Sequence, residues 1–194
     1  LNAIGLQNPG VDAVVNNILP TLDFNETRFI ANACGSTLEE YIAVCRRFDD
    51  SAIDAIEINI SCPNIKEGGA QFGTDSRLLS RVVAACRRVT TLPLITKLSP
   101  NVPSIAPFAQ AAAEAGSDGL SITNSFPAMA IDIETRRPRL ANVTGGLTGP
   151  CIKPMAVKLV WEAAQAVKIP IIGMGGIQSA ADAIEFMMAS AALW

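Results

Sequence analysis

The sequence predicts an α/β fold of parallel β-α units, and we favour a (β/α)8 TIM barrel over an open doubly wound sheet. Short apolar runs alternate with segments of helical spacing along the chain, which is the pattern of a parallel sheet. Polar and glycine-rich residues follow one predicted strand after another. All strand ends meet on one face of a barrel, whereas an open sheet gathers its ligand at a single switch point. The repeated polar strand ends therefore favour the barrel.

The first predicted unit runs from 28 to 50. The segment 28–35 reads as a strand, and 37–50 follows with apolar residues at helical spacing. Thr37 or Ser36 is a suitable N-cap, and acidic residues in the first turn suit the positive end of a helix.

The later units repeat this order. Asp75 is the expected N-cap of the helix at 75–89. Pro107 falls in the first turn of the helix at 104–116, where proline is tolerated, and Gly116 ends this helix. The further strands are predicted at 53–61, 92–99, 118–125 and 169–176, and the further helices at 75–89, 104–116, 153–167 and 179–189.

The number of predicted strands is smaller than a barrel needs. We count five strands, and 190–194 would begin a sixth. A closed barrel has eight strands in about 250 residues. Because no linker or repeat marks a second domain, we expect residues 1–194 to form one domain that is part of a barrel.

Composition restricts the function. The 194 residues are 49% hydrophobic and 17% charged, which is typical of a soluble globular domain. A formal net charge of −3 and only short basic pairs disfavour nucleic-acid binding. The sequence contains no apolar run of membrane-spanning length and no secretory signal pattern, so we expect neither membrane binding nor export.

Cysteine and histidine usage restricts the chemistry further. Five cysteines are widely spaced, with no disulfide framework, which predicts a reducing cytoplasmic location. The chain has no histidine. This removes Ser-His-Asp and Cys-His catalysis and disfavours a catalytic zinc site, so we expect no metal. Proton transfer has to use Cys, Lys, Tyr, Asp or Glu.

Two glycine clusters and one lysine are candidates for binding a phosphorylated cofactor. The clusters at 144–149 and 173–176 each precede a predicted helix, where glycine allows close approach and free N–H groups suit a phosphate. Tight turns are the alternative. Lys97 ends a strand, where a cation could stabilise negative charge on an electron-accepting ring; an ordinary surface lysine explains it equally well.

Cys62 lies in the stretch 59–64, NISCPN, at the end of a predicted strand. A buried, inert thiol suits Cys45 and Cys86, which fall in helical patterns, but packing gives no reason for a thiol between Ser61 and Pro63. Asparagines at strand ends could bind a planar heterocycle, although single asparagines are common in turns. Two hypotheses remain: a barrel enzyme with a cysteine acid/base, or a phosphate-binding barrel in which Cys62 is incidental.

Several motifs together resemble the class I dihydroorotate dehydrogenases, most closely the B-type, NAD-linked catalytic subunit. The similarity covers the whole chain. Members of class II have serine where this family has the cysteine of SCPN. The motifs are NAIGLQNPG (2–10), EINISCPNIKEGG (57–69), FGTD (72–75), KLSPNV (97–102), MAIDI (129–133), GGLTGPCIKP (145–154) and IPIIGMGGI (169–177).

The resemblance implies an FMN-containing barrel that oxidises dihydroorotate to orotate in pyrimidine synthesis. It implies that Cys62 is the base that removes a proton from C5, while hydride passes from C6 to the flavin. The implied substrate-binding residues are Asn2, Ala3, Ile4, Gly5, Leu6, Asn59, Asn124 and Ser125. The implied FMN-binding residues are Asn32, Asn59, Lys97, Thr123, Gly149, Gly175 and Gly176.

The resemblance also has departures and further implications. Ser125 stands where the family usually has threonine, and the family usually has a glycine near Ala128. The family's first two strands would precede Leu1, and the end of its last strand would follow Trp194.

B-type catalytic subunits form the homodimer core of a heterotetramer, with an FAD and iron–sulfur subunit that passes electrons to NAD. The alternative family is dihydropyrimidine dehydrogenase, which shares the cysteine and FMN but acts on uracil- or thymine-type rings.

Overall fold

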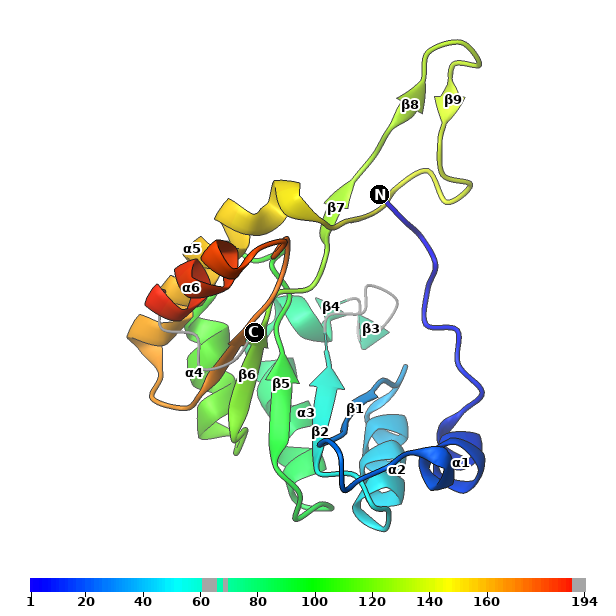
Figure 1. Ribbon diagram of the computed structural model, residues 1–194, viewed down its shortest axis with the longest axis vertical. Coiled ribbons are helices and arrows are strands. Elements are labelled where there is room, and N and C mark those ends of the chain that lie inside the picture. The colour runs from blue at the N-terminus through cyan, green and yellow to red at the C-terminus, as the bar shows by residue number, and fades with distance from the viewer. Residues whose placement is uncertain (61–65, 68–69, 190–194) are drawn as a thin grey trace.

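A five-stranded parallel sheet forms the centre of the protein (Figure 1). The computed structural model describes residues 1–60, 66–67 and 70–189. All four strand pairings are parallel, and strands adjacent in the sheet follow one another in the chain. This confirms the five predicted strands. In sheet order they are β1 (Ile30–Ala33), β2 (Ala55–Asn59), β5 (Leu94–Lys97), β6 (Gly119–Ile122) and β11 (Ile171–Gly173).

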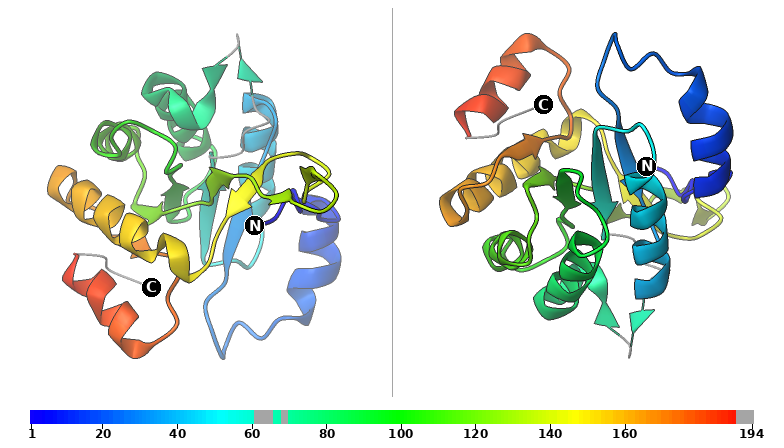
Figure 2. Two further views of the ribbon diagram at one scale, coloured as in Figure 1. Left: turned by 90° about the horizontal axis from the view of Figure 1, so that it is seen from above. Right: turned by 90° about the horizontal axis from the view of Figure 1, so that it is seen from below.

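Helices form an arc around one side of this curved sheet (Figure 2). One helix follows each of the five strands, as predicted. The parallel connections require such crossovers, because strands of the same direction cannot be joined by a tight turn. The helices are α2 (Leu38–Asp49), α3 (Ser76–Arg87), α4 (Ala106–Glu114), α5 (Lys153–Ala166) and α6 (Ala180–Met188).

The predicted caps are confirmed. Thr37 Oγ1 accepts a hydrogen bond from the backbone N–H of Glu40 at 3.2 Å. Asp75 Oδ1 accepts from the N–H groups of Arg77 at 2.8 Å and Leu78 at 3.3 Å. These bonds satisfy donors that a helix start otherwise leaves free. Backbone hydrogen bonds to Asp75 lower the pKa of its carboxyl group, so the cap is charged at neutral pH.

The hydrophobic core lies between the sheet and the helices. Ile56 and Ile58 of β2 are fully buried, as are Leu94, Leu120 and Ile122 of the neighbouring strands. They belong to one cluster with residues of α2, α3, α4 and α5. The covered face of the sheet is therefore apolar.

The sheet is open in the part of the chain that the structure describes. Strands β1 and β11 are its two edges and are not paired with each other. A closed barrel is thus not present among these residues, whereas the predicted parallel α/β arrangement is. The predicted strand at 190–194 lies outside the described residues.

Besides a short antiparallel hairpin of β3 (Lys66–Glu67) and β4 (Ala70–Gln71), two longer segments were not predicted. One runs through α1 (Val11–Ala13), the π-helical η1 (Val14–Ile18) and the 3-10 helix η2 (Leu19–Thr21). The other is an arm that projects from the body (Figure 1). Its strands pair β7 with β10 and β8 with β9, both antiparallel; they are β7 (Phe126–Ala128), β8 (Ile131–Asp132), β9 (Arg137–Pro138) and β10 (Gly145–Leu147).

Candidate functional site

A row of polar side chains occupies the face of the sheet opposite the helices. Residues paired in a parallel sheet point to the same side, and side chains alternate along each strand. Asn32 pairs with Glu57, Asn59 with Lys97, and Lys97 with Ser121. Parallel strands covered on both faces are usually apolar throughout, so this row indicates a surface that receives a polar ligand.

A carboxylate links two residues of this row. Glu57 Oε1 lies 3.6 Å from Lys97 Nζ and accepts a hydrogen bond from Asn32 Nδ2 at 2.5 Å. The side chains of Lys97 and Glu57 are only 18% and 13% exposed. Sequence reasoning identified Lys97 and Asn32 but missed Glu57. The signal was available in the sequence, since Glu57 is the one charged residue in the otherwise apolar run 55–58.

Two buried hydroxyl groups have no hydrogen-bond partner among the described residues. They are Ser121 Oγ, in the polar row, and Thr123 Oγ1, directly after β6. A buried hydroxyl without a partner is costly, so groups of this kind fit a ligand that completes their hydrogen bonding. Thr123 was a predicted FMN contact, whereas Ser121 was missed.

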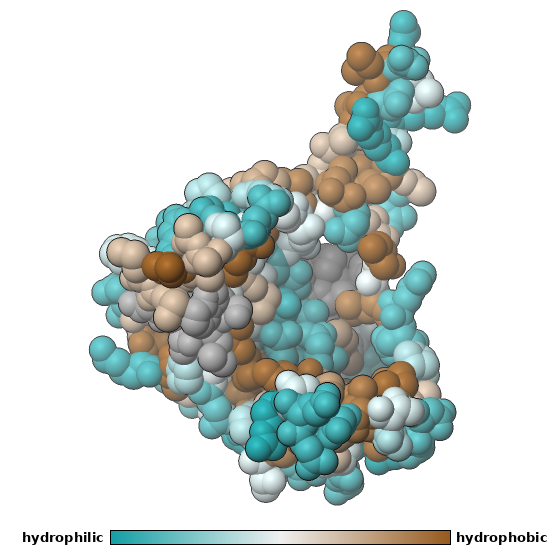
Figure 3. Space-filling model, viewed as in Figure 1, coloured by the Kyte–Doolittle hydropathy of each residue, from teal (hydrophilic) through white to brown (hydrophobic). Residues whose placement is uncertain are grey.

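A cavity of about 900 Å³ lies beside the strand ends. Figure 3 shows the molecule hollowed on this side, with hydrophilic residues on the floor of the hollow. The structure brings together at this cavity every residue that was predicted to bind substrate. They are Asn2, Ala3, Ile4, Gly5, Leu6, Asn59, Asn124 and Ser125.

The N-terminal segment is one wall of the cavity because it is bonded to β10. The backbone N–H of Asn2 donates to the Gly146 carbonyl at 3.0 Å, and the Gly146 N–H donates to the Asn2 carbonyl at 2.7 Å. Gly146 has to be glycine, since a Cβ there would overlap Ser125 Oγ. A close approach of three chain segments thus forms this wall.

Asn59 is fixed from two sides. The Tyr41 hydroxyl, fully buried on α2, donates to the Asn59 carbonyl at 2.7 Å. Asn124 Nδ2 donates to Asn59 Oδ1 at 3.3 Å. The two asparagines therefore present their amides to the cavity in a defined orientation.

The two glycine clusters lie against each other. A Cβ on Gly176 would come within 2.8 Å of the Gly149 carbonyl oxygen and 3.0 Å of Lys153 Cβ. Gly149 directly precedes the short helix η4 (Pro150–Ile152), which leads into α5. Gly175 and Gly176 precede α6, at φ +122° and +78°. This arrangement of loops before two helices suits a phosphate.

The ammonium of Lys153 is held by acidic groups. Its Nζ lies 2.6 Å from both Asp182 Oδ1 and Glu185 Oε2 on α6. Hydrogen bonds to these carboxylates raise the pKa of Lys153, and the bond from Lys153 lowers the pKa of Asp182. Lys153 therefore joins α5 to α6.

The cysteines separate by environment. Cys62 lies outside the described residues. Cys45 and Cys86 are fully buried, as predicted for inert thiols; a hydrogen bond with Cys45, together with burial, raises the pKa of Cys86. Cys151 is exposed, and Cys34 lines the cavity.

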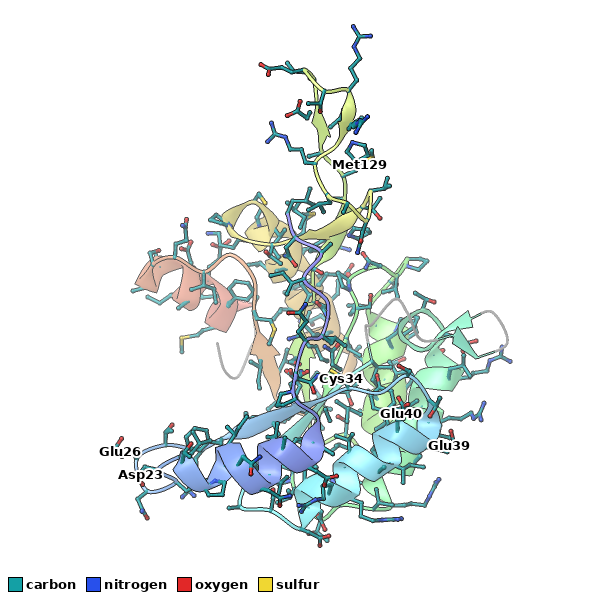
Figure 4. The ribbon with its side chains drawn as sticks, turned by 90° about the vertical axis from the view of Figure 1, so that its right-hand side faces the viewer. Asp23, Glu26, Cys34, Glu39, Glu40 and Met129 are labelled. Carbon is teal, nitrogen blue, oxygen red and sulfur yellow. The ribbon has the colours of Figure 1, made fainter. Side chains whose placement is uncertain are left out.

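Other cavity residues were missed by sequence reasoning. Figure 4 shows Cys34 beside the N-terminal segment and Glu40 at the start of α2. Nothing in their spacing marks them, because loops remote in sequence bring them together. The missed lining residues are Asn8, Cys34, Gly35, Ser36, Glu40, Gly73, Thr74, Ser99, Asn101, Pro127 and Asn142. Thr144, Gly145 and Gly146 also line the cavity and belong to the candidate glycine cluster 144–149.

Comparison with known proteins identifies the family. The model of the family described as dihydroorotate dehydrogenase matches residues 1–194. The chain belongs to the dihydroorotate dehydrogenase family. The chain is 53%, 54% and 55% identical over 192 residues to proteins of Pelobacter propionicus, Citrifermentans bemidjiense and Trichlorobacter lovleyi. Each is named dihydroorotate dehydrogenase B (NAD(+)), catalytic subunit. The resemblance stated from the motifs is confirmed.

The chain spans less than two thirds of the length of these relatives. Each alignment covers 98% of this chain but 63% of the dihydroorotate dehydrogenase relative. In the part of the chain that the structure describes, no helix has the length and apolar character needed to span a membrane.

Proposed function

We propose that the protein containing this chain oxidises dihydroorotate to orotate with bound FMN, as the catalytic subunit of an NAD-linked dihydroorotate dehydrogenase in pyrimidine biosynthesis. The observation that carries the proposal is the cavity, whose lining includes all eight predicted substrate residues beside the polar row. The names of the B-type relatives support the same activity.

The residues present fit FMN. The buried hydroxyls of Ser121 and Thr123 have no hydrogen-bond partner among the described residues, and FMN could supply one. The adjoining glycine loops suit its phosphate. We assign cofactor binding to Asn32, Asn59, Lys97, Thr123, Gly149, Gly175 and Gly176. When bound, FMN supplies the acceptor of two electrons; Lys97 supplies a positive charge beside it.

The chain's own residues bind the substrate and move the proton. We assign substrate binding to Asn2, Ala3, Ile4, Gly5, Leu6, Asn59, Asn124 and Ser125. The amides of Asn59 and Asn124 can donate to and accept from a ring with C=O and N–H groups. Cys62, two residues beyond Ile60, is assigned as the base for the C5 proton.

The decisive experiment is flavin reduction in the full-length protein. Cys62→Ala should keep the yellow cofactor but lower the rate of its bleaching by dihydroorotate about 10²–10⁴-fold, which is typical for loss of a positioned base. Cys62→Ser should retain weak activity that rises with pH, because a hydroxyl is less acidic than a thiol. Stopped-flow absorbance measures both.

Cys34→Ala separates the two thiols near the site. Cys34 lines the cavity, so it is the rival thiol within the described residues. Its replacement should slow bleaching less than tenfold. Near-normal bleaching in Cys62→Ala, with a large loss in Cys34→Ala, would overturn the assignment of Cys62.

The substrate is tested with the same assay. Dihydroorotate carries a carboxylate that dihydrouracil lacks. Bleaching by dihydrouracil but not by dihydroorotate would favour a dihydropyrimidine dehydrogenase-like activity. Retention of no flavin by the full-length protein would favour a non-catalytic phosphate-binding role.

We also propose the assembly and location of the B-type enzymes. The complete protein would close the sheet into a β/α barrel, act in the cytoplasm, and form the homodimer core of a heterotetramer with an FAD and iron–sulfur subunit. The catalytic chain alone should then reduce artificial acceptors, and NADH should form only after the partner is added. Efficient fumarate reduction without the partner would indicate the A-type instead.

A further inference from the structure

Glu57 occupies the centre of the polar row. Its strand β2 lies between β1 and β5, and its carboxylate contacts one side chain from each: Asn32 on β1 and Lys97 on β5. Both of these neighbours are assigned to the cofactor, whereas Glu57 has no assigned role. A carboxylate only 13% exposed on a face that receives an anionic cofactor calls for a reason.

The distances define what Glu57 does to each neighbour. The 2.5 Å bond from Asn32 Nδ2 fixes the amide nitrogen of Asn32 toward Glu57, and Asn32 Oδ1 then accepts from Cys34 Sγ at 3.2 Å. The 3.6 Å separation from Lys97 Nζ is an ion pair but is too long for a hydrogen bond. The ammonium of Lys97 is therefore held near Glu57, and within the described residues its N–H donors stay available to a ligand.

We propose that Glu57 is a positioning residue that holds Lys97 and Asn32 at the cofactor and weakens the stabilisation that the Lys97 charge gives to reduced FMN. This rests on the proposed function. Reduction adds negative charge to the cofactor, and a nearby cation favours the reduced form. A carboxylate beside that cation opposes the effect, so Glu57 lowers the reduction potential and keeps reoxidation by an acceptor favourable.

Glu57→Gln in the full-length protein tests the inference. Glutamine keeps the shape and an acceptor for Asn32 but removes the charge. The ratio of FMN affinities, reduced over oxidised, should rise about tenfold, since a charge a few ångströms away shifts such equilibria by at least about one decade. For a two-electron couple this is a rise of about 30 mV in midpoint potential, measured by dye-coupled redox titration.

Three further variants make the result specific. Glu57→Asp keeps the charge but withdraws it from Lys97, so the potential should rise less; this variant also serves if Glu57→Gln does not fold. Lys97→Met should lower the potential. Glu114→Gln, a matched charge removal on the exposed surface of α4, should leave it unchanged.

The outcomes separate this inference from the proposed function. An unchanged or lowered potential in Glu57→Gln, with FMN bound, overturns the role of Glu57 and leaves the proposed function intact. An equal rise in Glu114→Gln also overturns it. Failure of the unmodified full-length protein to bind FMN removes the proposed function itself.

Discussion

The two faces of the central sheet use the same strands in opposite ways. Toward the helices, Ile58 and Leu120 are fully buried in apolar surroundings. On the opposite face, Glu57 and Lys97 form an ion pair, and Ser121 Oγ has no partner among the described residues. The apolar face supplies the stability of the fold, and this allows the polar face to keep groups whose partners a ligand must provide.

The largest effect should come from the helix-covered face. Ile58→Ala removes a side chain that is 0% exposed and should lower the free energy of unfolding of the full-length protein by about 2–5 kcal/mol, through lost burial and the cavity left behind. Urea denaturation followed by circular dichroism measures this. A decrease in the free energy of unfolding of less than 1 kcal/mol would contradict the view that the helix-covered face supplies most of the stability.

The next effect tests the bond that joins the two faces. Tyr41→Phe removes the hydroxyl that donates to the Asn59 carbonyl and should cost about 1–3 kcal/mol, because a buried acceptor loses its donor. Since Asn59 lines the cavity, FMN or substrate affinity should fall as well. Lost stability with unchanged affinity would show that the two faces are independent at this point.

A smaller effect, dependent on pH, is expected where Lys153 joins α5 to α6. Because the pKa of Asp182 is lowered in the folded state, its ionised carboxylate stabilises the fold fully at pH values above the ordinary pKa of 3.8. This stabilisation is lost as the pH falls through the lower pKa of the folded state. Because the pKa of Lys153 is raised in the folded state, its ammonium stabilises the fold fully at pH values below 10.5. This stabilisation is lost as the pH rises through the higher pKa of the folded state. The stability difference between the unmodified protein and Asp182→Asn should therefore be constant near neutrality and shrink in strong acid. Denaturant titrations over this pH range measure it.

The smallest effect on folding should come from the buried hydroxyl of Ser121, on the polar face of the sheet. Ser121→Ala removes an Oγ without a partner, so the free energy of unfolding should change by less than about 0.5 kcal/mol or rise slightly, while FMN affinity falls. Thr96→Val is the matched control, because Thr96 Oγ1 shares a 2.8 Å hydrogen bond with Ser117 Oγ among buried residues. It should cost more stability, about 1 kcal/mol. A larger loss of stability in Ser121→Ala than in Thr96→Val would contradict the proposed difference between the two faces of the sheet.

Sequence reasoning found the repeating units because their signals are local. Apolar periodicity and the caps Thr37 and Asp75 depend on residues a few positions apart, and the structure retains all of them. The segment 11–21 was missed because its valines, asparagines and Pro20 are poor helix formers. Packing of Leu19 and the bonds from Arg47 to Asp12 and Asn16 stabilise it instead.

The site was predicted only in part, for a similar reason. The arm at 126–147 was missed because Pro127 and Pro138 stand inside its very short strands, where proline argues against a strand. The substrate residues came from family motifs, and their shared cavity confirms that they lie together. Glu57 was missed although its place in an apolar strand was visible, because its meaning depends on neighbours from two other strands.

The bond between Asn2 and Gly146 has a consequence for the order of folding. Each strand of the sheet pairs with the next one along the chain, so the sheet can grow unit by unit as the chain is made. The wall of the cavity joins residues 144 positions apart, and contacts of such separation form slowly because a long loop must first close. During synthesis Asn2 lacks this partner until β10 has left the ribosome, so β1, β2, β5 and β6 can pair before this wall of the cavity forms, and β11 joins the sheet afterwards.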